Sequence, residues 1–205
     1  MRDGGIVRTG PRPRLASLDG LPAAFDLLDW PLYTYYVKPG SRLGAVSSSR
    51  GCSFACSFCS QTQFLEKTWR ARDPRCVADE IAMLRGVHGA DVVLLTDEYP
   101  TSDPVRWEAL LDRLIELDLG VDLLMETRVQ DIVRDRAILP KYRKAGIVHV
   151  YVGIEATDQA TLNLVNKETT VDENKLALEL LNQHDLVSET SFVLGFPHET
   201  PEHVK

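Results

Sequence analysis

The stretch Cys52-Ser53-Phe54-Ala55-Cys56-Ser57-Phe58-Cys59 places three cysteines within eight residues, with the spacing C-x3-C-x2-C. The chain has four cysteines among its 205 residues, so most of its thiols lie in this one loop. Cysteine thiolates select soft metals, namely zinc, copper(I) or iron–sulfur clusters. The stretch therefore predicts a metal-binding loop.

The spacing favours an iron–sulfur cluster over zinc. A closed structural zinc site needs four ligands, commonly two pairs of closely spaced Cys or His, and Cys76 has no second such residue close to it in the sequence. A [4Fe–4S] cluster normally takes four cysteines, so three leave one iron without a protein ligand. Because an open coordination position is what a catalytic metal requires, we expect a cluster that binds a further molecule.

Length and composition indicate an ordinary globular domain. A chain of 205 residues buries roughly 70% of its unfolded surface, and 44% hydrophobic with 26% charged residues is typical of such domains. No apolar run reaches the length of a membrane span, and the tight cysteine triplet does not match a secreted disulfide framework. We therefore expect a cytoplasmic protein. The net charge of −7 argues against a nucleic-acid surface, which depends on clustered Lys and Arg.

Residues 1–42 contain five prolines and no sustained periodicity, which indicates an irregular arm or linker. We expect its aromatic group to pack on the domain, with the entrance of a substrate site as the alternative. That group consists of Trp30, Tyr33, Tyr35 and Tyr36.

From residue 43 onward, short apolar runs alternate with helical patterns, which predicts right-handed βα units and a parallel sheet. The predicted strands are residues 43–48, 92–96, 121–127, 148–154 and 191–194. The predicted helices begin at Pro74, after Asp73, and at Pro104, after Asp103, and then cover 131–145, interrupted at Pro140, 157–165 and 172–184.

Polar and charged residues follow the strands at their carboxyl ends, where the chemistry of such sheets occurs. They are Asp97 and Glu98 after the second strand, Glu126-Thr127-Arg128 at the third, Glu155 at the fourth and Gly195-Phe196-Pro197 after the fifth. Asp97 taken singly also fits a helix cap. A buried Glu155 carboxylate needs a partner, and we expect Arg128 to be that partner.

Together these residues resemble the radical S-adenosylmethionine (SAM) superfamily. The resemblance implies an α/β fold, a partial (β/α) barrel, in a core domain of residues 43–205. It also implies that Cys52, Cys56 and Cys59 hold a [4Fe–4S] cluster whose open iron binds SAM. The implied SAM contacts are Phe58 near the adenine, Asp97 and Glu98 near the amino group, Arg128 and Glu155 near the ribose or carboxylate, and Gly195 beside the adenine.

Five further segments resemble the oxygen-independent magnesium-protoporphyrin IX monomethyl ester cyclases, within the cobalamin-dependent branch of the superfamily. They are residues 95–101, 127–129, 142–150, 166–171 and 199–202. This resemblance implies a 5′-deoxyadenosyl radical that acts on a porphyrin substrate in bacteriochlorophyll biosynthesis, cobalamin as a further cofactor, and flavodoxin or ferredoxin as the electron donor.

Two alternatives to the cyclase are a cobalamin-dependent radical SAM methyltransferase and a non-catalytic iron–sulfur or zinc module with Cys76 as its fourth ligand. The branch carries an Asp-x-His-x-x-Gly motif in a cobalamin domain that is not found here, and the chain stops after the fifth strand. We therefore expect a fragment. We assign the histidines no role and expect His149 to be a core residue, with coordination of a substrate metal by His149 or His198 left open.

Overall fold

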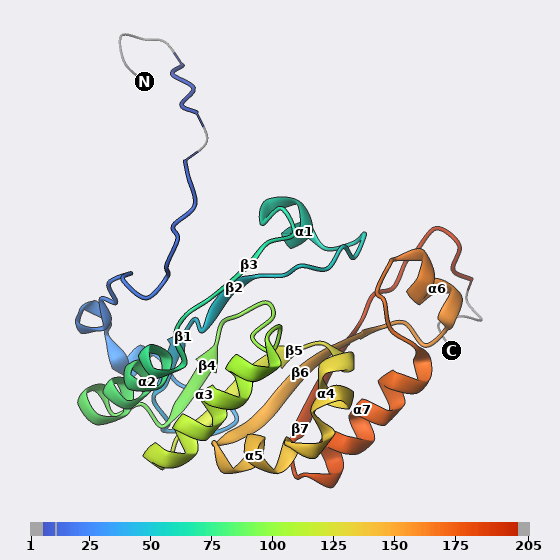
Figure 1. Ribbon diagram of the computed structural model, residues 1–205. Coiled ribbons are helices and arrows are strands. Elements are labelled where there is room, and N and C mark those ends of the chain that lie inside the picture. The colour runs from blue at the N-terminus through green and yellow to red at the C-terminus, as the bar shows by residue number, and fades with distance from the viewer. Residues whose placement is uncertain (1–5, 11, 201–205) are drawn as a thin grey trace.

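The computed structural model describes residues 6–10 and 12–200, and its centre is one parallel five-stranded sheet (Figure 1). The strand order β1-β4-β5-β6-β7 follows the chain, so each connection joins neighbouring strands. The sheet is open, with β1 and β7 at its edges, as expected for a partial barrel. The strands are β1 (Leu43–Val46), β4 (Val92–Leu95), β5 (Asp122–Thr127), β6 (Ile147–Glu155) and β7 (Val187–Phe192).

Helices cover one face of this sheet (Figure 1). They are α2 (Pro74–His88), α3 (Pro104–Leu117), α4 (Val129–Arg134), α5 (Leu139–Lys144) and α7 (Val171–Gln183). The predicted starts of α2 and α3 are confirmed: the Asp73 carboxylate accepts a hydrogen bond from the Arg75 amide, the Asp103 carboxylate accepts two amide hydrogen bonds, and proline follows each cap. Gly89 ends α2 with φ +67°, a backbone conformation that favours glycine.

The hydrophobic core lies between the sheet and these helices. Trp107 of α3 and Tyr142 of α5 are both fully buried there, with ring centroids 5.6 Å apart. Val93 and Leu95 enter the core from β4, whereas Leu94 points to the other face and remains 37% exposed. This alternation follows from the two-residue period of a strand. The second face of the sheet therefore carries its own set of side chains without a helical cover.

A small hairpin beside the sheet was not predicted. It consists of β2 (Ser49–Gly51) and the antiparallel β3 (Trp69–Ala71), and the segment between them holds the three cysteines and α1 (Ser60–Phe64). Figure 1 shows this segment projecting beyond the carboxyl ends of the central strands. Gly51 has φ +100°, and a Cβ there would lie 2.0 Å from the carbonyl oxygen of Thr68. Three-residue strands are too short to produce a recognisable periodicity.

Two predicted boundaries were wrong. The fifth strand is Val187–Phe192 rather than 191–194, because this exposed edge strand contains polar residues that the apolar pattern missed. The helix predicted over 131–145 divides into α4, the 3-10 turn η3 (Asp135–Ala137) and α5. Buried Asp135 accounts for the break, since its carboxylate accepts hydrogen bonds from the Arg134 guanidinium and the Tyr142 hydroxyl. The predicted helix over 157–165 is α6 (Gln159–Leu164).

The aromatic residues of the N-terminal arm do not form one group. After the 3-10 turn η1 (Phe25–Leu27), Trp30 opens the turn η2 (Trp30–Leu32) and stacks on His88 at 4.9 Å between ring centroids, so it packs on the domain as expected. Tyr35 and Tyr36 instead line a cavity on the uncovered face of the sheet.

No helix among the described residues is long and apolar enough to cross a membrane. Residues 201 and 202 of the segment 199–202 lie outside the described residues.

Candidate functional site

The cysteine loop is fastened to the turn that follows α6. The Ser57 amide donates to the Val165 carbonyl at 2.9 Å, and the Asn166 side-chain amide donates to the Ala55 carbonyl at 3.1 Å. Asn166 has φ +52°, a left-handed conformation that asparagine tolerates better than most residues. Two residues more than 100 positions along the chain therefore fix the backbone between the first and third cysteines.

The thiols of Cys52, Cys56 and Cys59 line one cavity of about 240 Å³ at the carboxyl ends of β5 and β6. The expected site residues that share it are Phe58, Glu98, Arg128 and Glu155. Asp97 and Gly195 are not among its lining residues, whereas Lys167 and Glu126, the latter one of the strand-end residues named above, are. Cys76 is exposed on α2 and does not line this cavity.

Arg128 brings a positive charge into contact with one of the thiols. Its guanidinium lies 3.4 Å from the Cys56 sulfur, stacks 3.5 Å from the ring centroid of Phe54, and donates to the Lys167 carbonyl. Its side chain is buried. A buried positive charge at this position stabilises thiolates, which are the form of cysteine that binds metal.

The partner of Glu155 is Lys167, so the expected ion pair between Glu155 and Arg128 was wrong. Lys167 Nζ lies 2.6 Å from Glu155 Oε1, and both side chains are buried. Gly153 makes room for this pair, because a Cβ there would lie 2.2 Å from Glu155 Oε1. Lys167 comes from the turn after α6, and the sequence carried no strand-end signal for it.

Asp97 and Glu98 have different surroundings. The Asp97 carboxylate is buried and accepts hydrogen bonds from the Ser48 amide at 2.8 Å, the Ser48 hydroxyl at 2.8 Å and the Ser49 hydroxyl. Burial raises its pKa above the ordinary value. Glu98 accepts a hydrogen bond from the Gly51 amide at 3.0 Å and faces the cysteine cavity. Asp97 thus holds the turn that leads into the loop, and Glu98 is the one of the two that reaches the cavity.

Glu126 stands between the cysteine cavity and the uncovered face of the sheet. Burial, together with the negative charges of Glu98 and Asp97, raises its pKa to about 7. Its side chain lines both the cysteine cavity and the neighbouring cavity on the open face. A carboxyl group with this pKa can hold or release a proton near neutral pH.

Gly195 lies after β7, outside the cysteine cavity. It has φ +96°, and its amide donates to the carboxylate of Glu199, which also accepts the Phe196 amide at 3.0 Å. The segment is therefore a closed turn held by its own glutamate. Its expected place beside an adenine stays a prediction.

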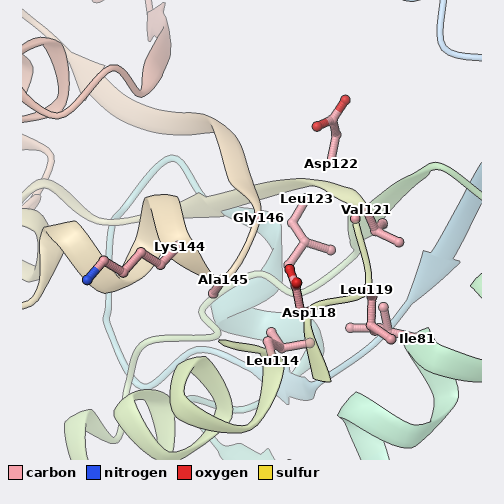
Figure 2. Close-up of a pocket in the computed structure, with 11 residues that line it drawn as sticks. Ile81, Leu114, Asp118, Leu119, Val121, Asp122, Leu123, Lys144, Ala145 and Gly146 are labelled. Carbon is pink, nitrogen blue, oxygen red and sulfur yellow. The ribbon is translucent and has the colours of Figure 1, made fainter. Parts of the chain in front are cut away.

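A separate cavity of about 260 Å³ lies at the amino end of β5, beside α2, α3 and α5 (Figure 2). Asp118 and Asp122 are its acidic groups, and Figure 2 shows Lys144 extending away from Asp118. None of the described residues that line it is a cysteine or a histidine. Because the strands start at this end, whereas chemistry in parallel sheets occurs where they finish, we assign it no part in the site.

The cysteine cavity has the donor chemistry of an iron–sulfur site. Burial raises the pKa of the Cys52 thiol, with Cys56 and Cys59 adding to the effect, and a bound metal removes the proton of a coordinating thiol outright. Within residues 6–10 and 12–200, no three His, Cys, Asp or Glu side chains form a ready group for a single metal ion. A single ion needs its ligands to converge on one point, whereas each thiolate of a cluster binds a different iron.

Residues 46–205 match the model of the radical SAM superfamily. The chain belongs to this superfamily. It is 41% identical over 200 residues to the anaerobic magnesium-protoporphyrin IX monomethyl ester cyclase of Rubrivivax gelatinosus, a match that covers 98% of this chain and 36% of the relative. The corresponding cyclase of Cereibacter sphaeroides is 40% identical, with 96% and 32% covered. The chain thus spans about a third of the length of these curated relatives.

Among solved structures, the chain resembles the radical SAM methyltransferase TsrM from Kitasatospora setae with cobalamin and a [4Fe–4S] cluster bound. The TM-score is 0.72 at 20% identity, with 80% of this chain and 31% of TsrM covered. At this identity the likeness establishes the fold. Superfamily membership implies a [4Fe–4S] cluster and SAM, and the three thiols of the cavity and the cations beside them fit this pair of cofactors.

Proposed function

We propose that this chain is the SAM-cleaving core of an enzyme that closes a ring on a magnesium porphyrin. The observation that carries the proposal is the convergence of Cys52, Cys56 and Cys59 with two buried cations, Arg128 and Lys167, around one cavity. The cluster, when bound, supplies the electron that cleaves SAM to methionine and a 5′-deoxyadenosyl radical. The remaining chemistry of binding and orientation belongs to the side chains of the chain itself.

We assign a task to five side chains of the cavity and to the turn at Gly195. Phe58, which is 39% exposed, presents a ring to the adenine. Glu98 accepts hydrogen bonds from the SAM amino group while its other contact, the Gly51 amide, holds it in place. Arg128 and Lys167 offset the negative charge of the thiolates and of the SAM carboxylate. Glu155 keeps Lys167 in position, and the turn at Gly195 covers the adenine.

The assignment of a porphyrin as the substrate is supported by sequence similarity to the two cyclases. Each of them is about 40% identical to this chain over nearly its whole length. Because the chain spans about a third of those relatives, we propose SAM cleavage for this chain and the complete ring closure only for a protein of the relatives' full length. Cobalamin and a reduced flavodoxin or ferredoxin are proposed as its further cofactor and its electron donor. Methyl transfer is the second candidate function, supported by 28% identity over 206 residues to an uncharacterized methyltransferase of Pyrococcus horikoshii.

The test is anaerobic reconstitution with iron and sulfide, followed by dithionite and SAM. We expect 5′-deoxyadenosine to form in the wild-type chain and the Cys76→Ala variant, because Cys76 lies outside the cavity, and not in Cys56→Ala. S-adenosylhomocysteine and a methylated product in place of 5′-deoxyadenosine would favour the methyltransferase. A chain that takes up one zinc ion and assembles no cluster, or that depends on Cys76, would overturn the proposal in favour of the non-catalytic module.

A further inference from the structure

The uncovered face of the sheet carries a long depression that we call the open-face trough. Its middle part is a cavity of about 440 Å³. It shares Glu126 and Tyr151 with the cysteine cavity, and it shares His149 and Glu189 with a cavity of about 410 Å³ near the starts of β6 and β7. The trough therefore runs along the strands from the cysteine site towards their amino ends.

Aromatic and apolar side chains line the trough together with four carboxylates, those of Asp97, Asp122, Glu126 and Glu189. Tyr35 and Tyr36 of the N-terminal arm lie over one end, with their rings edge to face at 5.6 Å between centroids. Tyr36 is 85% exposed, so its ring is accessible to a ligand. Leu94 and Leu124 line the floor. The aromatic and apolar part of this lining suits a broad, flat ligand, because aromatic rings stack on extended π systems.

His149 is the one histidine among the trough's lining residues, and its expected place in the core was wrong. Its side chain is 18% exposed, and its Nε2 lies 3.1 Å from the Glu189 carboxylate of the neighbouring strand. Its Nδ1 has no hydrogen-bond partner among the described residues. This atom is not fully buried either, so a ligand can reach it. An imidazole with one nitrogen held by a carboxylate and the other free is the usual arrangement of a metal-ligating histidine.

We infer that the open-face trough binds a flat metal-containing macrocycle and that His149 is the axial ligand of its metal. The inference rests on the proposed function, which supplies a magnesium porphyrin as the substrate class. The four macrocycle nitrogens leave axial positions of the metal open, and neutral imidazole is the commonest protein ligand for metals. Glu189 would fix the tautomer and the orientation of the ring.

The spacing along β6 relates this ligand to the reaction site. His149, Tyr151, Gly153 and Glu155 point to the same face, and two residues of strand advance roughly 7 Å. A macrocycle centred on His149 would therefore place its edge beside Tyr151 and Glu126, where the trough meets the cysteine cavity. A peripheral side chain would then point towards the site of radical formation, while the metal stays about two residues of strand further away.

The test compares the binding of zinc protoporphyrin with that of metal-free protoporphyrin. Each porphyrin is added to the chain without SAM or reductant, and its binding is measured from the change in Soret absorbance. We expect the wild-type chain to bind zinc protoporphyrin with a shifted Soret band. His149→Ala should weaken zinc protoporphyrin binding by at least about tenfold, since losing even an outer partner of a metal ligand has an effect of that size. Its affinity for metal-free protoporphyrin should change less than about twofold, which is within ordinary variation between surface variants.

The matched control is His184→Ala, the same change at the end of α7 and outside the trough, which should leave both affinities unchanged. Equal loss for both porphyrins in His149→Ala, or no binding of either porphyrin by the wild-type chain, would overturn the inference. Failure of the proposed function gives a different result: a Cys56→Ala chain should lose 5′-deoxyadenosine formation and still bind zinc protoporphyrin, because the two sites are at different places along β6.

Discussion

Lys167 Nζ and Glu155 Oε1 lie 2.6 Å apart, and both side chains are buried at the end of β6 beside the three thiols. The pair joins the central sheet to the turn that fastens the cysteine loop. Buried charges are tolerated when they are paired, and removing one partner leaves the other without compensation.

Lys167→Met should therefore lower the free energy of unfolding by about 3–5 kcal/mol, measured by urea denaturation. The double variant Glu155→Gln with Lys167→Met removes both charges and should recover most of this loss. If the single and double variants were equally unstable, packing of the Lys167 stem rather than the unpaired carboxylate would be the cause.

Asp97→Asn should destabilise the chain by about 1–3 kcal/mol, because one carboxylate oxygen that accepts from Ser48 and Ser49 becomes an NH2 donor. Asp118→Asn is the control, since Asp118 is exposed at the end of α3 and asparagine tolerates its φ of +43°. Unchanged stability together with weaker SAM binding would instead support the role of Asp97 that the family resemblance implies.

Glu126 should make stability depend on pH. Its pKa of about 7 in the folded chain exceeds the ordinary 4.5, so between these values the unfolded chain loses a proton that the folded chain keeps. The free energy of unfolding should therefore fall as the pH rises from about 4.5 to about 7, and level off above that.

Replacing Glu126 with glutamine removes this dependence. The free energy of unfolding of Glu126→Gln is compared with that of the wild-type chain at each pH. This difference should favour the variant by about 1–2 kcal/mol more at pH 8 than at pH 5, a figure already reduced for the partial solvent exposure of Glu126. Urea denaturation at both pH values measures it. Glu179→Gln, on the exposed side of α7, should give no difference between the two pH values, and an equal difference would contradict the prediction.

Asn166→Gly should loosen the cysteine loop. Glycine accepts the φ of +52° and removes the side-chain hydrogen bond to Ala55, which contributes about 1 kcal/mol. Iron should then leave the reconstituted chain about fivefold faster in the presence of a chelator. Asn163→Ala on α6 is the control, because the one side-chain hydrogen bond of Asn163 within the described part of the chain comes from Gln159 and not from the cysteine loop. Equal release rates in the two variants would show that the turn does not restrain the loop.

Local patterns predicted most of the fold because the relevant signals are short. The carboxylates of Asp73 and Asp103 accept hydrogen bonds from backbone amides two or three residues later. The signal for each helix start therefore lies in neighbouring residues of the sequence. The edge strand β7 was misplaced because an exposed strand needs no apolar run, and its register comes from pairing with β6.

The sequence by itself determined the cysteine loop, the parallel order of the strands and the rim where the site lies, because spacing and periodicity are local properties. Only the tertiary structure decided which charges meet there. Lys167 rather than Arg128 pairs with Glu155, Asp97 is enclosed by Ser48 and Ser49, and His149 faces a trough instead of the core. Each of these depends on side chains brought together from distant positions, and on which face of the sheet the helices leave uncovered.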